Sequence, residues 1–280
     1  MAIASSEKIS SQVRRDIIRM VTDVQSGHPG GSLGCADFMT LLHFEIMEIK
    51  PEDWQMDGKG EDIFFLSNGH ISPCLYSVLA HRGYFNKTEL GTFRKLGSRL
   101  QGHPTPDKGL PGVRIATGSL GQGLSVAIGC ALAKKLNGDS KLVYTLHGDG
   151  ELQEGQIWEA AMYAAANNVD NLIATIDYNH KQIDGDIDDV LPMGDLKQKW
   201  QAFGWDVLEM NGHDFDNMRS ILKSAKEKTG KGKPVIIVMN TIMGKGVAFM
   251  EGTHKWHGSP PSKEQAEKAL AAIDETTGDY

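Results

Sequence analysis

Apolar and polar positions follow two alternating patterns along this chain: the spacing of amphipathic helices and the short apolar runs of buried strands. Helical spacing of apolar residues extends from Ile9 to Val24 and predicts the first helix. The same criterion predicts helices at 36–47, 73–82, 87–96, 122–136, 156–168, 196–203 and 215–228, and strands at 62–66, 141–146, 172–177, 206–210 and 235–239. A capping box of Ser262 and Gln265 predicts the start of a last helix. Because strands and helices alternate, the expected fold class is α/β, a doubly wound, mostly parallel sheet with helices on both faces.

Composition adds few constraints to this picture. The sequence shows no internal repeat or low-complexity linker, so residues 1–280 are expected to form a single domain. The net charge of −7 argues against a nucleic-acid partner, which would require a basic face. A polar N-terminal stretch and the lack of a run of about 18 apolar residues favour a cytoplasmic protein with no membrane partner. The isolated cysteines show neither metal spacing nor a disulfide framework and are expected as small core residues: Cys35, Cys74 and Cys130.

The stretch from Lys141 to Gly185 carries the clearest chemical signal. One apolar strand ends in HGDG, the next ends before Tyr178 and Asn179, and a single crossover helix separates them. Such a unit makes adjacent parallel strands, so Asp149 and Asn179 are expected side by side at the edge where α/β sheets bind ligands. Carboxylate and amide oxygens, with free backbone N–H groups, suit a divalent cation that carries phosphate. Taken singly, Asp149 as a helix cap and Asn179 as a turn residue are the simpler interpretations; together, the metal site accounts for them better.

Histidines next to glycines supply a second signal. They are His28, His70, His103, His147, His213 and His257. Each alone is compatible with a surface turn, but several at one strand-end edge favour a shared site for proton transfer. The Gly- and Pro-rich segment 97–121 is expected to be a functional loop, because it leads directly into a helix. Glu151, Glu154 and Glu159 are interpreted as charges near a helix N-terminus, and the acidic segment 184–189 as a solvated loop.

Seven motifs between residues 26 and 260 resemble those of transketolases and occur in the same order. They are SGHPGGSLG, LSNGH, LGSRLQGHP, TGSLGQGLS, GDGELQEG, IDYNHKQIDG and GTHKWHGSP. The GDG sequence, followed by Asn179 after the next strand, also resembles the signature of thiamine diphosphate enzymes. The resemblance implies the diphosphate-binding domain of that fold, and an enzyme of carbohydrate metabolism and the pentose phosphate pathway. Such an enzyme transfers a two-carbon ketol unit from a ketose phosphate to an aldose phosphate.

The resemblance also implies roles for single residues. Those implied to hold Mg²⁺, for which Ca²⁺ or Mn²⁺ can substitute, are Asp149, Asn179 and the backbone carbonyl of Lys181. Those implied to contact thiamine diphosphate are His70 and Gly150 at the diphosphate, and Gly118, Ser119 and Leu120 at the rings. Those implied to bind and protonate the sugar phosphate are His28, His103 and His257. The chain departs from some relatives at Met243, Asn68 and Gly31, where those have lysine, lysine and serine.

In the family, a second domain on another subunit holds the aminopyrimidine end of the cofactor, and residues 1–280 show no counterpart of it. The resemblance therefore implies a split transketolase, in which this chain is the N-terminal subunit of an α2β2 heterotetramer with a separate C-terminal subunit. Three alternatives stay open: the α subunit of a 2-oxoacid dehydrogenase or a deoxyxylulose-phosphate synthase-like enzyme, a transketolase for a branched sugar phosphate, and a non-catalytic scaffold. The histidine cluster favours a polyhydroxylated sugar over a 2-oxoacid.

Overall fold

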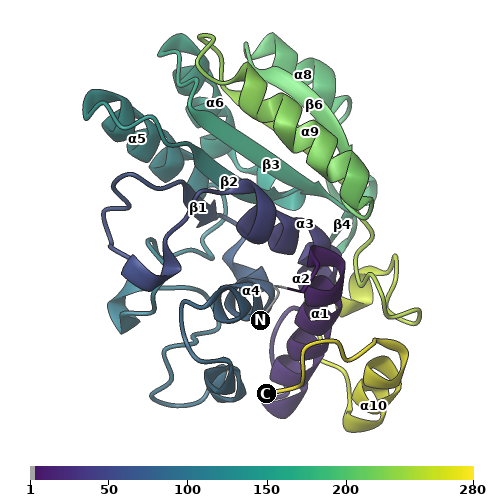
Figure 1. The fold of residues 1–280 in the computed structure, drawn as a ribbon. Helices are drawn as coiled ribbons and strands as arrows, with labels where there is room; N and C mark the ends of the chain where they lie inside the picture. Colours follow the sequence, from purple (N-terminus) through teal and green to yellow (C-terminus); the bar gives the residue numbers. More distant parts are fainter. Residues whose placement is uncertain (1–3) are drawn as a thin grey trace.

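A five-stranded parallel sheet forms the centre of the molecule in a computed structural model that describes residues 4–280 (Figure 1). Its strands, in spatial order, are β1 (Ile63–Leu66), β2 (Val143–Gly148), β3 (Leu172–Tyr178), β7 (Val235–Asn240) and β6 (Asp206–Asn211). Every neighbouring pair in this sheet is parallel. The predicted fold class and the adjacency of the strands before Asp149 and Asn179 are therefore confirmed.

Helices cover both faces of the sheet. They are α1 (Ser6–Asp23), α2 (Pro29–Gly34), α3 (Ala36–Leu41), α4 (Ser72–Arg82), α5 (Gly123–Leu136), α6 (Gly155–Ala166), α7 (Ile187–Val190), α8 (Leu196–Ala202), α9 (Phe215–Lys228) and α10 (Lys263–Ala272). A small hairpin of β4 (Lys181–Gln182) and β5 (Gly185–Asp186) follows β3. The predicted cap of α9 by Asp214 is present, as is the capping box of α10. Each helix within residues 4–280 is too short or too polar to cross a lipid bilayer.

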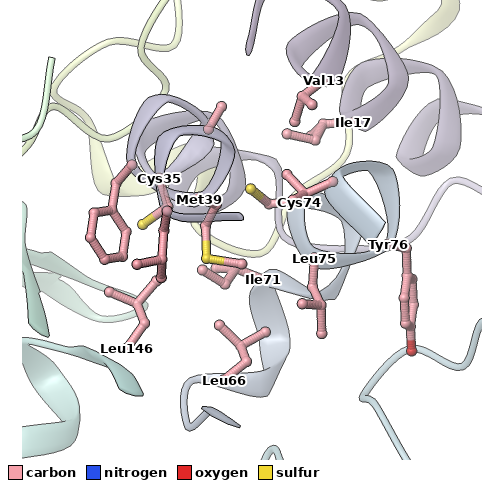
Figure 2. Packing of buried hydrophobic residues seen from close by; sticks show 14 of the residues in the cluster. Val13, Ile17, Cys35, Met39, Leu66, Ile71, Cys74, Leu75, Tyr76 and Leu146 are labelled. Carbon is pink, nitrogen blue, oxygen red and sulfur yellow. The ribbon is translucent and has the colours of Figure 1, made fainter. Parts of the chain in front are cut away.

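The two faces of the sheet bury separate cores because successive side chains of a strand point to opposite sides. On β1, Phe64 and Leu66 join the core beneath α1, α3, α4 and α9, whereas Ile63 and Phe65 join the core beneath α5, α6 and α8. Figure 2 shows the first core, where Leu66 and Leu146 of the sheet meet Met39 and Ile71. Cys35 and Cys74 are buried in it, as predicted, and Cys130 is partly buried.

Two predicted segments have a different structure. The helix predicted at 87–96 is wrong: only a 3-10 helix at Lys87–Thr92 forms. Its apolar residues Leu90 and Phe93 lie one 3-10 turn apart and are buried, while Leu96 is fully exposed and gives no reason to extend the helix. The acidic loop that follows β3 contains the hairpin and the short helix α7, although its carboxylates are largely exposed, as expected.

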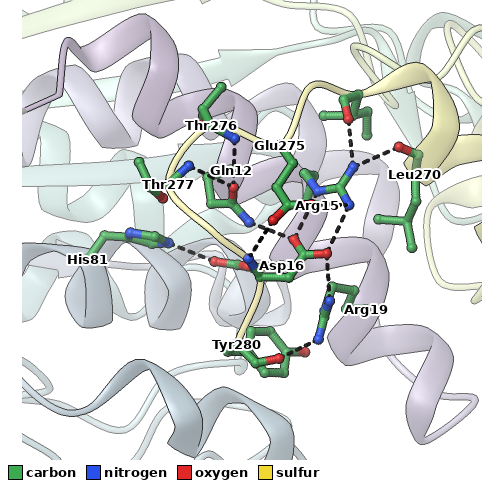
Figure 3. Close-up of polar contacts among 12 residues, drawn as sticks. Gln12, Arg15, Asp16, Arg19, His81, Leu270, Glu275, Thr276, Thr277 and Tyr280 are labelled. Atoms are coloured by element: carbon green, nitrogen blue, oxygen red, sulfur yellow. Dashed lines mark hydrogen bonds and ion pairs between the residues drawn. The ribbon is translucent and has the colours of Figure 1, made fainter.

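Residues 274–280 lie along α1 and are held there by charge (Figure 3). The Asp279 carboxylate accepts hydrogen bonds from Arg15 at 2.9 and 2.8 Å and from Gln12 at 2.8 Å. Arg19 lies 2.7 Å from the same carboxylate and also stacks over the Tyr280 ring. These contacts fix the far side of α1, which leads on its other end into the site.

Candidate active site

A cavity of about 370 Å³ opens where β1, β2, β3 and β7 end. Its lining includes all but one of the residues implied by the resemblance: His28, His70, His103, Gly118, Leu120, Asp149, Gly150, Asn179, Lys181 and His257. Ser119 is not part of the lining. The positions that differ from some relatives, Gly31, Asn68 and Met243, also face the cavity. Segments far apart in the sequence thus converge at the sheet edge that the β2–β3 unit predicted.

Four histidines form one wall of the cavity. They come from the turn before α2, the 3-10 turn after β1, the loop 97–121 and the segment after β7: His28, His70, His103 and His257. Ring centroids of His28 lie 5.1 Å from His70, 6.3 Å from His103 and 5.7 Å from His257. His147 and His213 are not in this cluster: His147 is buried against Thr145 at 2.7 Å, and His213 contacts Asp37.

The histidines of this wall are held neutral. Burial, with the neighbouring His257, lowers the pKa of His28 to about 4. Burial also lowers the pKa of His70, and it does so for His103 and His257. A neutral imidazole has one N–H donor and one bare nitrogen acceptor. The wall can therefore donate and accept hydrogen bonds at once, which is the chemistry that hydroxyl groups require.

The opposite end of the cavity is acidic. Asp149 is 2% exposed, and its carboxylate accepts the N–H groups of Gly150 at 2.8 Å and His180 at 2.7 Å. Asp149 thus caps the turn after β2, as the simpler interpretation held, and faces the cavity as well. Burial, and then the charge of Asp177, raise the pKa of Asp149 to about 8.

Asn179 is oriented by a carboxylate that the sequence interpretation missed. The Asn179 amide nitrogen donates to Asp177 at 2.8 Å, and the Thr241 hydroxyl donates to the other oxygen of Asp177. The Asn179 oxygen is thereby turned the other way, where it accepts the Lys181 N–H at 2.9 Å. The signal was available: Asp177 and Asn179 are two positions apart along an extended chain and so share a face.

This donor set fits a divalent cation with phosphate oxygens. Within residues 4–280, no group of three or more His, Cys, Asp or Glu side chains is placed to hold a metal by itself. A cation here would therefore depend on amide, backbone and ligand oxygens beside Asp149, which suits Mg²⁺. A cation would also relieve the unfavourable burial of Asp149 beside Asp177. In the described part of the chain, the buried Oδ1 of Asn68 has no hydrogen-bond partner, so it is free to contact a ligand.

Glu151 has a role different from the helix-end charge that was expected. It is 1% exposed and accepts the N–H groups of Gly121 at 2.9 Å and Gly148 at 3.1 Å, with the Ser67 hydroxyl as a third donor. Charge-assisted hydrogen bonds of this kind are stronger than neutral ones. Glu151 therefore ties together the ends of β1, β2 and the loop 97–121. Glu154 and Glu159, in contrast, are exposed.

Gly118 brings His103 into the site. Its backbone has φ +123°, and a Cβ there would lie 2.6 Å from Cδ2 of His103. Only glycine tolerates both that conformation and that contact. The loop 97–121 is thus shaped around a glycine that lets His103 lie against the chain.

Known proteins agree with this site. The family model for "Transketolase, thiamine diphosphate binding domain" matches residues 5–273. One of the named subunits of the apulose-4-phosphate transketolase of Phocaeicola vulgatus is 38% identical over 275 residues, 98% of this chain and 96% of that protein. The 6-deoxy-6-sulfo-D-fructose transketolase subunit SqwG of a Clostridium species is 39% identical, over 96% of this chain and 98% of that protein.

Longer relatives match over part of their length. Human transketolase is 36% identical over 94% of this chain and 41% of its own. The solved structure of the Leishmania mexicana transketolase superposes with a TM-score of 0.91 at 33% identity, and the match covers all of this chain but 43% of that one. With the family model, the relatives of similar length and this structural match, the chain belongs to the transketolase family, and residues 5–273 are a thiamine diphosphate binding domain of that family.

Proposed function

We propose that this chain is the N-terminal subunit of a two-chain transketolase that transfers a two-carbon ketol unit from a ketose phosphate to an aldose phosphate. The observation that carries the proposal is the single cavity with a neutral histidine wall at one end and the buried Asp149 and Asn179 at the other. One end suits the hydroxyl groups of a sugar, and the other suits a metal-bound diphosphate.

The acidic end is proposed to hold the cofactor. Asp149, the Asn179 amide oxygen and the Lys181 carbonyl bind Mg²⁺, for which Ca²⁺ or Mn²⁺ substitutes. His70 and the Gly150 backbone hold the diphosphate, and residues 118–120 lie against the rings. When bound, thiamine diphosphate supplies the electron sink that lets a carbon–carbon bond beside a carbonyl group break.

The histidine wall is proposed to handle the sugar. His28, His103 and His257 bind hydroxyl groups through their N–H donors and bare nitrogens. A hydroxyl proton moves onto a bare ring nitrogen when the sugar bond breaks, and it returns when the new bond forms. Their lowered pKa values keep these nitrogens free to accept a proton at neutral pH.

The remaining half of the site is proposed to come from a separate C-terminal subunit in a cytoplasmic α2β2 assembly. Relatives of nearly the same length are named as subunits, which supports two chains. Those relatives are named for apulose-4-phosphate and for 6-deoxy-6-sulfo-D-fructose. A branched or modified sugar is therefore proposed beside the ordinary pentose phosphates as a ketol donor.

Co-expression with a C-terminal-type transketolase subunit tests the proposal. The purified complex should transfer a ketol unit to an aldose phosphate in the presence of Mg²⁺ and thiamine diphosphate, while the Asp149→Ala complex should not. Pentose phosphates, apulose-4-phosphate and 6-deoxy-6-sulfo-D-fructose serve as donors in parallel. Full activity of this chain alone would refute the two-chain assignment. Decarboxylation of pyruvate without ketol transfer would refute the reaction itself.

A further inference from the structure

The segment that follows β7 forms part of the cavity wall and has little regular structure of its own. Met243 and His257 of this segment line the cavity, and its one short element is a 3-10 turn at His254–Trp256. The Gly252 N–H donates to the Met243 carbonyl at 2.9 Å, so the segment folds back on its own beginning. The placement of its first turn, residues 242–246, therefore affects where His257 lies.

Three side chains outside the cavity hold that first turn at both ends. His213 Nε2 accepts the Ile242 N–H at 2.8 Å, and Arg14 Nε donates to the Lys245 carbonyl at 3.0 Å. Asp37 lies between them: its oxygens accept both terminal nitrogens of Arg14 at 2.7 Å and His213 Nδ1 at 3.0 Å. One carboxylate from α3 thus connects both contacts.

The hydrogen bonds determine the protonation of this group. A backbone N–H only donates, so Nε2 of His213 must be the bare nitrogen and Nδ1 must carry the proton that Asp37 accepts. Arg14 is 8% exposed and Asp37 5%. Burial acts to raise the pKa of Asp37, but the hydrogen bond from His213 and the charge of Arg14 hold that pKa well below its usual range. The group is a buried ion pair that fixes one histidine tautomer.

Glycines let the held turn press against α2. A Cβ on Gly30 would lie 2.7 Å from Cγ of Met243, and a Cβ on Gly34 would lie 3.1 Å from the Ile242 carbonyl oxygen. The Gly244 N–H also donates to the Gly30 carbonyl at 2.8 Å. The turn therefore touches the helix that begins beside His28, and a shift of the turn would disturb both sides of the cavity.

We propose that His213, Asp37 and Arg14 form a clamp that positions the cavity wall carrying Met243 and His257. His213 is the key positioning residue, because it alone accepts the Ile242 N–H. None of the three side chains lines the cavity, so they act through the backbone that they hold. The clamp concerns the wall itself and does not depend on the proposed reaction.

Substitutions of His213 separate its two hydrogen bonds. Asn places its amide where Nδ1 lies, so His213→Asn keeps the donor to Asp37 and removes the acceptor for Ile242. Gln reaches the position of Nε2, so His213→Gln keeps that acceptor. Hydrogen–deuterium exchange of the peptide spanning 241–250 measures the difference. We expect exchange at Ile242 to be about five-fold faster in His213→Asn, the factor for a hydrogen bond of about 1 kcal/mol, and close to wild type in His213→Gln.

A second histidine–aspartate pair provides the matched control. His81 Nε2 lies 2.9 Å from Asp16 between side chains that are 6% and 1% exposed, a burial similar to that of His213 and Asp37. His81→Asn should leave exchange at 241–250 unchanged. Asp37 is kept intact in these variants because its loss would leave Arg14 charged and buried without a partner.

Exchange at Ile242 that is as slow in His213→Asn as in wild type would overturn the clamp. Equal acceleration by His213→Gln, or by His81→Asn, would overturn it as well, because the effect would then be general loosening. Titration of the same proteins with Mg²⁺ and thiamine diphosphate adds a readout that rests on the proposed function. If wild type itself bound neither, that function would fail, while the exchange data would still decide on the clamp.

Discussion

Replacement of Glu151 by glutamine should destabilise the protein although the side chain keeps its size. One oxygen of Glu151 accepts the Gly121 N–H at 2.9 Å and the Ser67 hydroxyl, and the other accepts the Gly148 N–H at 3.1 Å. Glutamine has one oxygen, so its NH2 group must face at least one buried N–H. The arrangement that loses least leaves Gly148 without an acceptor.

The magnitude follows from these contacts. A buried N–H group left without an acceptor costs about 1–3 kcal/mol. The two remaining hydrogen bonds lose their charge assistance, which adds about 1 kcal/mol. A total of about 2–4 kcal/mol corresponds to a decrease in Tm of roughly 5–12 °C for a domain of this size. Because the side chain is 1% exposed, water cannot replace the lost acceptor.

Thermal unfolding by calorimetry, with urea unfolding as a second measure, tests this prediction. Glu267→Gln is the control, since Glu267 is exposed on α10 and should change stability by no more than about 0.5 kcal/mol. A Tm for Glu151→Gln within about 2 °C of wild type would refute the reasoning. It would mean that the loop 97–121 is held by its other contacts and not by this carboxylate.

Three further predictions concern the site and its support. Asp177→Asn should weaken Mg²⁺ binding by about 10–100-fold, because Asn179 loses the carboxylate that orients it; calorimetric titration of Mg²⁺ with thiamine diphosphate present measures this, and an unchanged Kd would contradict it. Gly118→Ala should lower Tm more than Gly109→Ala, since both positions have positive φ but only Gly118 would press a Cβ onto His103; equal effects would show that the contact is unimportant. The hydrogen bond from Arg15 holds the pKa of Asp279 below its usual range, so Asp279→Asn should cost about 1–3 kcal/mol at pH 7. That carboxylate stabilises the fold above its unfolded pKa of about 3.9, so the difference from wild type should shrink as pH falls through about 4 and below; a constant difference in pH-dependent urea unfolding would exclude this origin.

Sequence patterns predicted the parallel sheet and the meeting of Asp149 with Asn179 because both depend on local rules. A strand, one crossover helix and a second strand leave one common arrangement, and the residues after each strand must lie at the same edge. The histidine wall was predicted as a shared site from glycine neighbours alone. Its members were assigned to the sugar only through the resemblance to transketolases.

The parts that sequence patterns missed depend on contacts across the fold. Glu151 was interpreted as a charge near a helix end because no local pattern shows that Gly121 and Ser67 come to it. His213 shared its glycine neighbour with the cavity histidines, yet it lies against Asp37, which belongs to a different helix. The helix predicted at 87–96 failed because two buried residues three positions apart fit a 3-10 turn as well as an α-helix.

The acidic end of the cavity has a consequence for how its ligands bind. Among the residues of 4–280 that line the cavity, Lys181 is the one lysine or arginine, and its ammonium group is paired with Asp186 at 2.6 Å. A diphosphate alone would therefore approach Asp149 with no free cationic side chain to offset the repulsion. Cation and diphosphate should each raise the affinity of the protein for the other by the same factor, as thermodynamic linkage requires.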